Sequence, residues 1–558
     1  MKLGRMVRRL EGRHSGTIFF ICSHRANYLY WMAMTSSPLV KSLQNPKCYS
    51  HPVSHVTLVE THISWVFLTG QYVYKIKKPV LFTFADFSTL EKRRWFCEEE
   101  VRLNRRLAPQ LYLGVVSITG SPSNPRMDGD GSPFEWAVKM KQFPPDQEFH
   151  NLLETGNLHE SVVGQLAIDI GTFHGRIESV GEPIPYGEPE MVWRPIAECF
   201  EDIPLAALPV RIQSCMQDIK EWTNQEWRRL RPILRERKSS GQIRECHGDL
   251  HLGNIALFEG RTCVFDALEF EPRLRWIDVI SEVAFLVMDL ESKDRVDLAY
   301  WFLNCYLEVT GDYAGMGVFR LYKVYRALVR AKVAGLRLAQ VEPGSPVRED
   351  FLEEIIRYVE LANRLVMSAP PMLMMMHGVS GTGKTTVSTE VVKALGAVRV
   401  RSDVERKRIH AQQRKIVVGQ GTSKSLYAPD MTRATYGRLW DLTNTMLQAG
   451  YSVVVDATFL EGAQRQSFIR LAHQRHVSIV ILDVWAPDEV LAERIACRAE
   501  QQTDASDATI GVMEQQKIKE EPLTEFEQDI TIRVDSTDLQ TFRSTITSLI
   551  EQGKKRAN

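Results

Sequence analysis

The last third of the chain carries a glycine-rich segment whose residue types can hold a polyphosphate. It reads Gly378-Val379-Ser380-Gly381-Thr382-Gly383-Lys384-Thr385 and follows an apolar run. Glycines let backbone N–H groups turn toward phosphate oxygens where a Cβ would block them. Lys384 would reach the β- and γ-phosphates, and the Thr385 hydroxyl would bind Mg²⁺ at the start of a helix. We therefore expect ATP and Mg²⁺ here, in contact with Gly378, Ser380, Gly381, Thr382, Gly383, Lys384, Thr385 and Thr386.

Two acids follow apolar runs in the same part of the chain, where strands are expected to end. Val453-Val454-Val455 leads into Asp456, so this carboxylate is expected to help hold Mg²⁺. Arg401-Ser402 leads into Asp403, which can accept the proton of a substrate hydroxyl as a general base. For either acid the alternative is a helix N-cap, because Asp is a good cap.

Arg494 and Arg498 are four residues apart in a segment with helical periodicity, so they share one face of the expected helix. Two guanidinium groups on one face can close over a transferring phosphoryl group and neutralise its charge. The alternative is a solvated helix face with no role in chemistry.

A second constellation lies in the middle of the chain, at Cys246-His247-Gly248-Asp249-Leu250-His251-Leu252-Gly253-Asn254. An acid followed five residues later by Asn has the spacing of kinase catalytic loops. In such loops the acid, here Asp249, orients or deprotonates the attacking hydroxyl, and the Asn, here Asn254, holds Mg²⁺. A predicted hairpin then ends in Asp266, the expected second metal carboxylate. The alternative is a set of turn and strand-end residues without chemistry.

A kinase-like site also needs a Lys on an early strand and a Glu on the following helix to anchor phosphate. Glu100 falls on the apolar face of a predicted helix, where a carboxylate is costly unless it has a partner. Lys75 lies in a predicted strand just upstream, so we expect it to pair with Glu100. Lys77, on the same face of that strand, is the competitor, and a solvated lysine is the remaining alternative.

These residues must be positioned by regular elements, and the chain after Ala369-Pro370-Pro371 predicts strands that alternate with helices. Such alternation predicts an α/β domain with a parallel sheet and helices on both faces, as in P-loop NTPases. The expected strands are 373–377, 397–401, 452–456, 477–484 and 530–534, and the expected helices are 384–395, 431–448 and 487–498, with one more after the last strand.

The preceding part of the chain predicts a mixed α+β domain. Strands are expected at 65–68 and 72–76, and Ser88-Thr89-Leu90-Glu91 has the spacing of a capping box at a helix start. Further along, 120–131 is expected to be a loop, 246–270 is strand-like, and 160–240 and 276–366 are mostly helical. We expect a kinase-like domain at 38–368 and a P-loop domain at 369–558.

The composition is that of a folded globular protein without a global charge. Apolar residues are 44% and charged residues 25%, and 69 Lys and Arg balance 69 Asp and Glu in a chain of 558 residues, long enough for two or three domains. Zero net charge gives no general attraction to nucleic acid or to an acidic membrane. No apolar run approaches the ~18 residues that a membrane span needs. Nine dispersed cysteines suggest neither zinc nor disulfides and favour the cytoplasm.

The first 33 residues are basic, with Glu11 as their only acid. The apolar stretch at 18–22 is shorter than the ~7–15 residues of a signal-peptide core. His24 and Arg25 follow it, where a small-residue cleavage site would be needed. We expect residues 1–37 to be a disordered extension, or Met34 to be the true start of the protein.

Residues 372–555 resemble the P-loop kinases that include polynucleotide 5′-hydroxyl kinases, chloramphenicol phosphotransferases, gluconate kinases and zeta toxins. The resemblance rests on the P-loop, Arg401-Ser402-Asp403, Asp456-Ala457-Thr458 and the arginines before Asp504-Ala505-Ser506-Asp507-Ala508. It implies that Asp403 is the general base and that Arg494 and Arg498 belong to a lid. An Asn-Lys-x-Asp guanine signature is missing, which argues against a GTPase.

Residues 50–340 resemble the aminoglycoside phosphotransferase family, which also contains choline and homoserine kinases. The His247-to-His251 segment and Asp266 carry most of this resemblance, and Asp278 matches a further family acid of structural role. No Gly-x-Gly-x-x-Gly loop precedes the Lys75 strand, although that family often has a shorter loop there. The whole arrangement resembles bacterial proteins that fuse an aminoglycoside phosphotransferase-like domain to an ATP-binding P-loop domain.

These features together predict a bifunctional ATP-dependent phosphotransferase, each half of which transfers the γ-phosphoryl group to a hydroxyl of a small molecule. One alternative is a nucleotide-responsive binding module in one half that regulates the other, which the missing glycine-rich loop suggests. Another is a polynucleotide 5′-hydroxyl kinase. The neutral net charge argues against nucleic acid as a partner, whereas Arg401, Arg406, Lys407 and Arg408 keep that alternative open.

Overall fold

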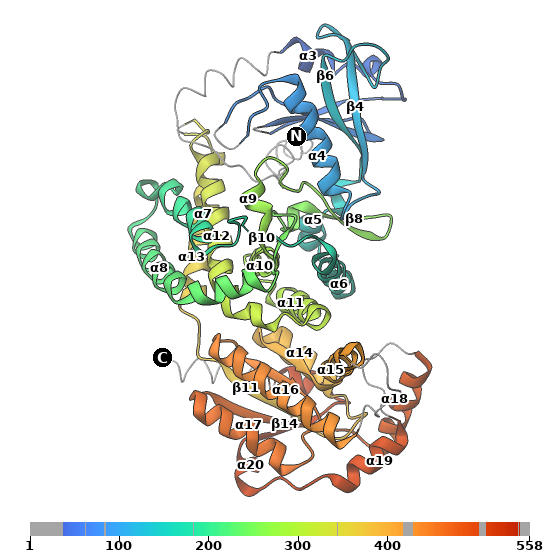
Figure 1. Cartoon of the computed structure of the whole chain (residues 1–558), viewed down its shortest axis with the longest axis vertical. Coiled ribbons are helices and arrows are strands. Elements are labelled where there is room, and N and C mark those ends of the chain that lie inside the picture. Colours follow the sequence, from blue (N-terminus) through green and yellow to red (C-terminus); the bar gives the residue numbers. More distant parts are fainter. Residues whose placement is uncertain are drawn as a thin grey trace. The chain divides into compact units, whose positions relative to one another are not determined.

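The structure is a computed structural model of the whole chain, and it describes residues 37–61, 63–82, 85–181, 183–342, 344–416, 428–501, 509–544 and 546 (Figure 1). Within these ranges, the side chains of 413–416 and 498–501 are outside the description. Two compact units are formed, which we call the N-terminal unit (residues up to 292, and 321–366) and the C-terminal unit (293–320, and 367 onward). The expected extension up to residue 36, with Met34, lies outside the described residues.

The N-terminal unit contains an antiparallel sheet with the strand order β1-β2-β3-β6-β4-β5. Ala137 and Val138, adjacent on β6, are both fully buried because the two faces of the sheet are covered by different apolar clusters. Helix α4 packs across β4 and β6 on the face of Val138. The strands are β1 (Thr57–Glu60), β2 (Ser64–Leu68), β3 (Tyr72–Lys77), β4 (Tyr112–Ser121), β5 (Asn124–Met127) and β6 (Glu135–Lys141), and the helices of this part are α3 (Pro38–Ser42) and α4 (Leu90–Asn104).

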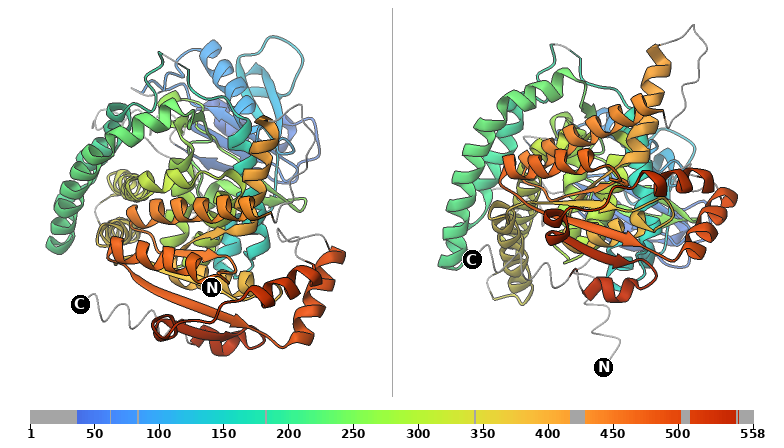
Figure 2. Two further views of the ribbon diagram at one scale, coloured as in Figure 1. Left: turned by 60° about the horizontal axis from the view of Figure 1, so that its bottom comes forward. Right: turned by 90° about the horizontal axis from the view of Figure 1, so that it is seen from below.

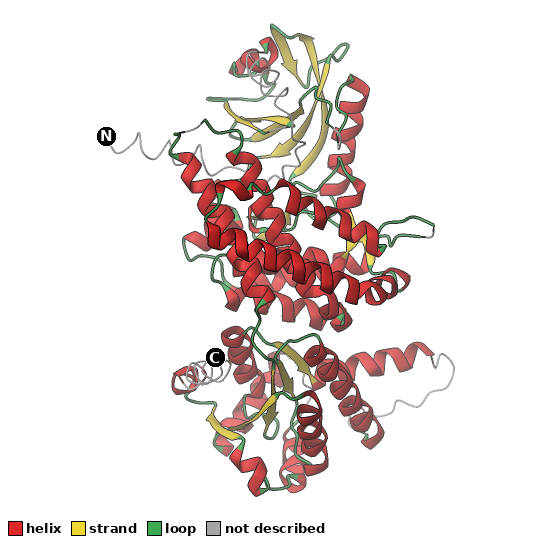
Figure 3. Ribbon diagram, turned by 90° about the vertical axis from the view of Figure 1, so that its left-hand side faces the viewer, coloured by secondary structure: helices red, strands yellow, loops and turns green. Residues whose placement is uncertain are grey.

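A largely helical part completes the N-terminal unit, and Figure 3 shows it as a region distinct from the sheet. Two small antiparallel pairs lie within it, β7 (Ile243–Glu245) with β10 (Trp276–Asp278), and β8 (Ile255–Phe258) with β9 (Arg261–Val264). The catalytic-loop segment predicted from the sequence runs from β7 to β8. The helices are α5 (Phe149–Glu154), α6 (Glu160–Arg176), α7 (Pro189–Asp202), α8 (Val210–Ser239), α9 (Pro272–Arg275), α10 (Val279–Glu291), α12 (Met316–Leu338, whose first turn belongs to the C-terminal unit) and α13 (Val347–Val366).

The C-terminal unit is built on a five-stranded parallel sheet with the order β12-β13-β11-β14-β15, whose strands lie side by side in Figure 2. The runs of Val and Met predicted to be strands are buried along their whole length, as expected for parallel strands covered by helices. The strands are β11 (Met372–His377), β12 (Val398–Arg401), β13 (Val453–Asp456), β14 (Ser478–Trp485) and β15 (Thr531–Asp535), and the helices are α11 (Val296–Thr310), α14 (Lys384–Leu395), α15 (Ser402–Ile416), α16 (Pro429–Gln448), α17 (Gly462–Arg475), α18 (Asp488–Gln501), α19 (Ile510–Lys519) and α20 (Glu525–Asp529).

The predicted fold class is confirmed, and two local predictions need correction. The capping box does not begin α4, because Thr89 rather than Ser88 is the N-cap and its hydroxyl accepts from the Lys92 N–H. The expected loop at 120–131 contains strand β5, since Asn124–Met127 turns back along β4 as a hairpin. Residues 293–320 belong to the C-terminal unit, although the sequence suggested that they continue the N-terminal domain. Among the described helices, none combines the length and apolar character required to cross a membrane.

Candidate active sites

The glycine-rich segment adopts the strand–loop–helix geometry that its sequence predicts. Strand β11 ends at His377, the loop turns at Gly378 (φ +126°) and Gly383 (φ +89°), and α14 begins at Lys384. A Cβ on Gly378 would lie 2.4 Å from the backbone oxygen of Val484, so only glycine fits there. The Nζ of Lys384 donates to the Val379 backbone oxygen at 2.7 Å. The loop therefore lies at the N-terminus of a helix, the arrangement that binds phosphate.

A cavity of about 780 Å³ lies at the carboxyl ends of the C-terminal strands, where ligands of open α/β sheets bind. Most of the residues predicted for this site line it. Thr382 does not, because its buried hydroxyl donates to the Val379 backbone oxygen at 3.0 Å, and Gly378 is also outside the lining. The predicted residues in the lining are Ser380, Gly381, Gly383, Lys384, Thr385, Thr386, Asp403, Asp456 and Arg494.

Asp456 and Thr385 supply the oxygen ligands expected of a magnesium site. Asp456 is the last residue of β13, only 6% exposed, and α17 has a different N-cap, so the alternative role as a helix cap is excluded. Its Oδ2 accepts from the Ser388 hydroxyl at 3.1 Å and lies 3.8 Å from the Nε of Arg401. Carboxylate and hydroxyl oxygens beside a phosphate-binding loop fit Mg²⁺, which binds through few protein ligands and the phosphates themselves.

Asp403 lies in the wall of the same cavity, as the second residue of α15 rather than its N-cap. Its Oδ1 is 3.1 Å from the Nη1 of Arg406, one turn further along the helix. The side chain is 27% exposed, so a substrate hydroxyl can reach it from the cavity. Asp403 is thus accessible as a proton acceptor, with its charge stabilised by Arg406.

Arg494 extends from α18 to the phosphate-binding loop. Its Nη1 donates to the Ser536 hydroxyl at 2.8 Å and lies 3.4 Å from the Gly381 backbone oxygen. A Cβ on Gly383 would lie 3.0 Å from this same nitrogen, which places the guanidinium directly against the loop. The backbone of Arg498 belongs to α18, but its side chain lies outside the described residues.

Three lining residues come from α11, far upstream in the sequence. Trp301, Cys305 and Glu308 all reach the cavity. The Glu308 carboxylate accepts from Arg399 at 2.7 Å and from Arg401 at 3.2 Å. Sequence reasoning did not find these residues, because nothing in the local pattern of α11 connects it to a strand about 90 positions away.

The second predicted site is assembled in the N-terminal unit around a buried loop. Asp249 is completely buried, and the Nδ2 of Asn254 donates to its Oδ2 at 2.9 Å and to its backbone oxygen at 3.0 Å. The Oδ1 of Asp249 and the Oδ1 of Asn254 receive no hydrogen bond from the described residues. Buried acceptor oxygens without a hydrogen bond suit a cation, and the one on Asn254 belongs to a predicted Mg²⁺ ligand.

Lys75, on β3, connects the sheet to α4 and to Asp266, which follows β9. Its Nζ lies 2.5 Å from Asp266 and 2.9 Å from Glu100, so the expected Lys75–Glu100 pair is present. Lys77, the competitor, also pairs with Glu100 and with the buried Glu269, which the sequence analysis did not consider. Burial alone would lower the pKa of Lys75, but Asp266 and Glu100 raise it well above its ordinary value. The predicted phosphate anchor is therefore part of a network of two lysines and three carboxylates.

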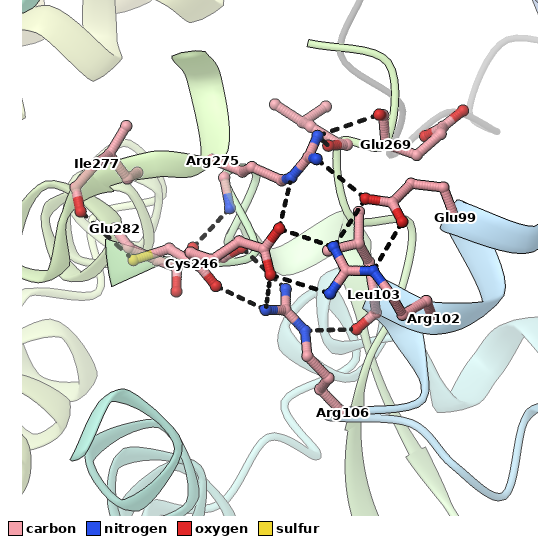
Figure 4. Close-up of polar contacts among 12 residues, drawn as sticks. Glu99, Arg102, Leu103, Arg106, Cys246, Glu269, Arg275, Ile277 and Glu282 are labelled. Atoms are coloured by element: carbon pink, nitrogen blue, oxygen red, sulfur yellow. Dashed lines mark hydrogen bonds and ion pairs between the residues drawn. The ribbon is translucent and has the colours of Figure 1, made fainter. Parts of the chain in front are cut away.

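A second ionic network connects α4 to the segment that precedes Asp249 (Figure 4). Glu245, at the end of β7, accepts from Arg102 at 2.7 Å, from Arg106 at 3.1 Å and from Arg275 at 3.2 Å. Arg102 and Arg275 also pair with Glu99 at 2.7 and 3.0 Å. Because Glu99 is adjacent to Glu100, the network holds the anchor helix and the loop together.

Helix α10 holds the predicted catalytic loop from its other side. The Gly248 N–H donates to Glu282 at 2.6 Å, and the Leu252 N–H donates to Asp289 at 3.0 Å. The second oxygen of Glu282 lies 2.7 Å from the Nε2 of His174. Three acids interrupt the apolar run of α10, and their presence is the sequence signal that could have indicated this role. Asp278, which precedes α10, pairs with Arg237 at 2.5 Å and caps the helix, so its role is structural.

Comparison with known proteins assigns families to both parts of the chain. Residues 94–319 match the phosphotransferase enzyme family, and residues 373–523 match an AAA domain family. Uncharacterized proteins of Mycobacterium tuberculosis and Mycobacterium bovis are 30% identical over 464 residues, which span 82% of this chain and 90% of each relative.

Solved structures resemble one part or the other at lower identity. An amicoumacin kinase in complex with AMP-PNP and Ca²⁺ is 15% identical, covering 60% of this chain and 94% of its own, with a TM-score of 0.36. The APS kinase of Mycobacterium tuberculosis in complex with AMPPNP and APS is 14% identical, covering 33% of this chain and 99% of its own, with a TM-score of 0.25. Similarity at these TM-scores supports no conclusion about activity.

Proposed function

We propose that this chain, which belongs to the family of these mycobacterial proteins, transfers the γ-phosphoryl group of ATP to a hydroxyl of a small molecule. It joins a phosphotransferase domain to a P-loop kinase domain. The observation that carries this proposal is the cavity of about 780 Å³ in the C-terminal unit. It brings Lys384 and Thr385 of the phosphate-binding loop together with Asp403, Asp456 and Arg494, which come from three other elements.

In the C-terminal unit, the residues that line the cavity have roles that their positions support, and Gly378, Thr382 and Arg498 keep the roles that the sequence predicts. The loop amides, with Gly378, Thr382 and Thr386, would hold the phosphates, and Lys384 would leave the Val379 oxygen to bind the β- and γ-phosphates. Thr385 and Asp456 would hold Mg²⁺, which neutralises charge on the phosphates. The acceptor hydroxyl attacks the γ-phosphorus, its proton passes to Asp403, and the bond to ADP breaks. Arg494, and Arg498 from the same helix, would stabilise the charge of the transferring group.

In the N-terminal unit, Asp249 would be the base and Asn254 and Asp266 would hold Mg²⁺. Lys75 would bind the phosphates while Glu100 keeps its ammonium in place. Asp249 is buried, and Lys75 is in contact with Asp266. This site must therefore open for a nucleotide to bind. That closure favours a second candidate for this unit, a nucleotide-responsive module that regulates the other without turning over ATP itself.

The proposal is tested by two substitutions in the C-terminal cavity. Calorimetry with Mg-ATP should show one binding component lost or weakened at least ~10-fold in Lys384→Ala, because a charge-assisted contact to phosphate is removed. Asp403→Asn should keep that component and reduce acceptor-dependent turnover by ~100- to 10,000-fold, because only the base is lost.

Lys393→Ala is the matched control, since Lys393 lies on the same helix as Lys384 but pairs with Glu390 outside the cavity. It should change neither quantity. Unchanged Mg-ATP binding in Lys384→Ala, or full turnover in Asp403→Asn, would contradict the assignment of the cavity.

A further inference from the structure

Helix α11 is a structural part of the C-terminal unit, where it packs against α14 and β12. Strand β12 is an edge strand, so one side of its backbone lacks a partner strand. The buried Asn304 of α11 takes that place. Its Nδ2 donates to the Ala397 backbone oxygen at 3.0 Å, and its Oδ1 accepts from the Arg399 N–H at 2.6 Å.

Glu308 lies one helical turn after Asn304 and engages both arginines of the same strand. Its Oε1 accepts from Arg399 at 2.7 Å, and its Oε2 accepts from the Nη1 of Arg401 at 3.2 Å. The Arg408 guanidinium of α15 donates to the backbone oxygen of Glu308 at 2.6 Å. The carboxylate of Glu308 is therefore held in place on several sides.

Arg401 lies between two carboxylates in the cavity wall. On one side is Glu308, and on the other its Nε is 3.8 Å from the Oδ2 of Asp456, the expected magnesium carboxylate. Arg401 and Asp456 end neighbouring strands in register, so their side chains leave the sheet at the same level. A guanidinium that moved closer to Asp456 would compete with Mg²⁺ for the same oxygen.

We propose that Glu308 is a positioning residue of the C-terminal site, which restrains Arg401 and so leaves Asp456 to Mg²⁺. This inference rests on the proposed function of that cavity, and it gives the inserted segment 293–320 a role in phosphoryl transfer. Glu308 provides the second acceptor that Arg401 needs, and its own position is fixed by Arg399. Loss of the Glu308 charge removes the carboxylate that lies 3.2 Å from Arg401, and the attraction of Asp456 at 3.8 Å is then no longer opposed from that side.

The test uses calorimetry on the full chain and follows the ATP-binding component that Lys384→Ala removes. Its affinity is measured in EDTA and then at increasing Mg²⁺ concentrations. Relative to the affinity that each protein has in EDTA, Glu308→Gln should raise the Mg²⁺ concentration needed for half of the gain in ATP affinity about tenfold. The double variant Glu308→Gln with Arg401→Gln should show the same Mg²⁺ dependence of ATP affinity as Arg401→Gln alone, because the competing cation is gone. A purely structural role for Glu308 would not produce this rescue.

Asp297→Asn is the matched control, because Asp297 lies on α11, pairs with Arg295 and is outside the cavity lining. Wild-type Mg²⁺ dependence in Glu308→Gln, or a double variant no better than Glu308→Gln, would overturn the inference. If Glu308→Gln does not fold, Arg401→Gln alone tests the inference. A smaller gain in ATP affinity with Mg²⁺ than in wild type contradicts competition between Arg401 and Mg²⁺, and an equal or larger gain supports it. Wild type that binds no ATP at this component would instead refute the proposed function.

Discussion

At the residue scale, the N-terminal site is organised around one buried carboxylate, that of Glu100. It contacts the ammonium groups of Lys75 and Lys77, and Lys75 extends from it to Asp266. Burial would raise the pKa of Glu100, but the two lysines hold it below its ordinary value. The anchor therefore keeps its charge, as a phosphate-binding lysine paired with a glutamate requires.

Glu100→Gln should destabilise the N-terminal unit by about 3 kcal/mol at pH 7, because two buried ammonium groups lose a shared partner. The depressed pKa means that Glu100 stabilises the fold above its ordinary pKa of 4.5 and that this contribution is lost as the pH falls through its folded value. The difference between wild type and variant in thermal unfolding should thus be constant above about pH 5 and shrink below about pH 4.5.

Glu98→Gln is the control on the same helix, since Glu98 is 52% exposed and pairs only with Arg94 in the described structure. Its effect should stay below ~1 kcal/mol, as for other surface ion pairs. Equal effects of the two substitutions, or a Glu100→Gln effect that does not shrink as the pH falls below about 4.5, would contradict the role given to this carboxylate.

Residue chemistry was predictable where one short segment carries it. The P-loop occupies a few consecutive positions, and so does the segment from Asp249 to Asn254. Asp266 follows soon after, at the end of a short hairpin. Whether Lys75 or Lys77 meets Glu100 could not be decided, because strand alternation places both on one face and both in fact pair with it. Glu269 and Glu308 were missed, since their partners are distant in sequence.

At the scale of elements, the C-terminal site depends on an edge strand that a helix completes. Asn304 gives β12 two hydrogen bonds, and the Tyr313 hydroxyl lies 3.4 Å from the Arg399 backbone oxygen. Because β12 leads directly into Asp403, the stability of this edge determines how firmly the predicted base is held.

Asn304→Ala should leave two buried backbone groups of β12 without partners, at a cost of about 1–3 kcal/mol. The amides of residues 398–401 should then exchange with deuterium roughly 10-fold faster or more, as measured by mass spectrometry of the full chain. Asn224→Ala, at an exposed position of α8, should not change exchange in β12. Unaltered protection of β12 in Asn304→Ala would show that α11 does not support this edge.

The five strands of the C-terminal sheet followed from the sequence, since buried parallel strands read as continuous apolar runs, whereas helices α15, α17, α19 and α20 were not predicted. Strand β5 was not predicted because Gly, Ser and Pro are frequent in its hairpin, and pairing with β4 outweighs local preference there. The start of α4 was misplaced by one residue, because Ser88 and Thr89 are equally good caps and only the backbone course distinguishes them.

At the scale of the whole molecule, the chain holds two candidate Mg-ATP sites, and they differ in how accessible their residues are. The C-terminal site is an open cavity of about 780 Å³, whereas the predicted base of the N-terminal site is completely buried. The division of the chain into units could not be predicted fully, because residues 293–320 pack with the C-terminal sheet while the residues on either side belong to the N-terminal unit. Sequence order alone does not reveal such an insertion.

Acceptor-dependent ATP consumption tests the central claim most directly. Wild type, Lys384→Ala and Asp249→Ala should be compared with sugars, nucleosides, amino alcohols, aminoglycosides and 5′-hydroxyl oligonucleotides as acceptors. We predict that wild type consumes ATP with at least one acceptor and that Lys384→Ala abolishes this turnover. Any turnover that only Asp249→Ala abolishes would belong to the N-terminal site. Wild type that binds Mg-ATP but consumes none with every acceptor, or turnover that survives both substitutions, would contradict the assignment of this chain as a phosphotransferase.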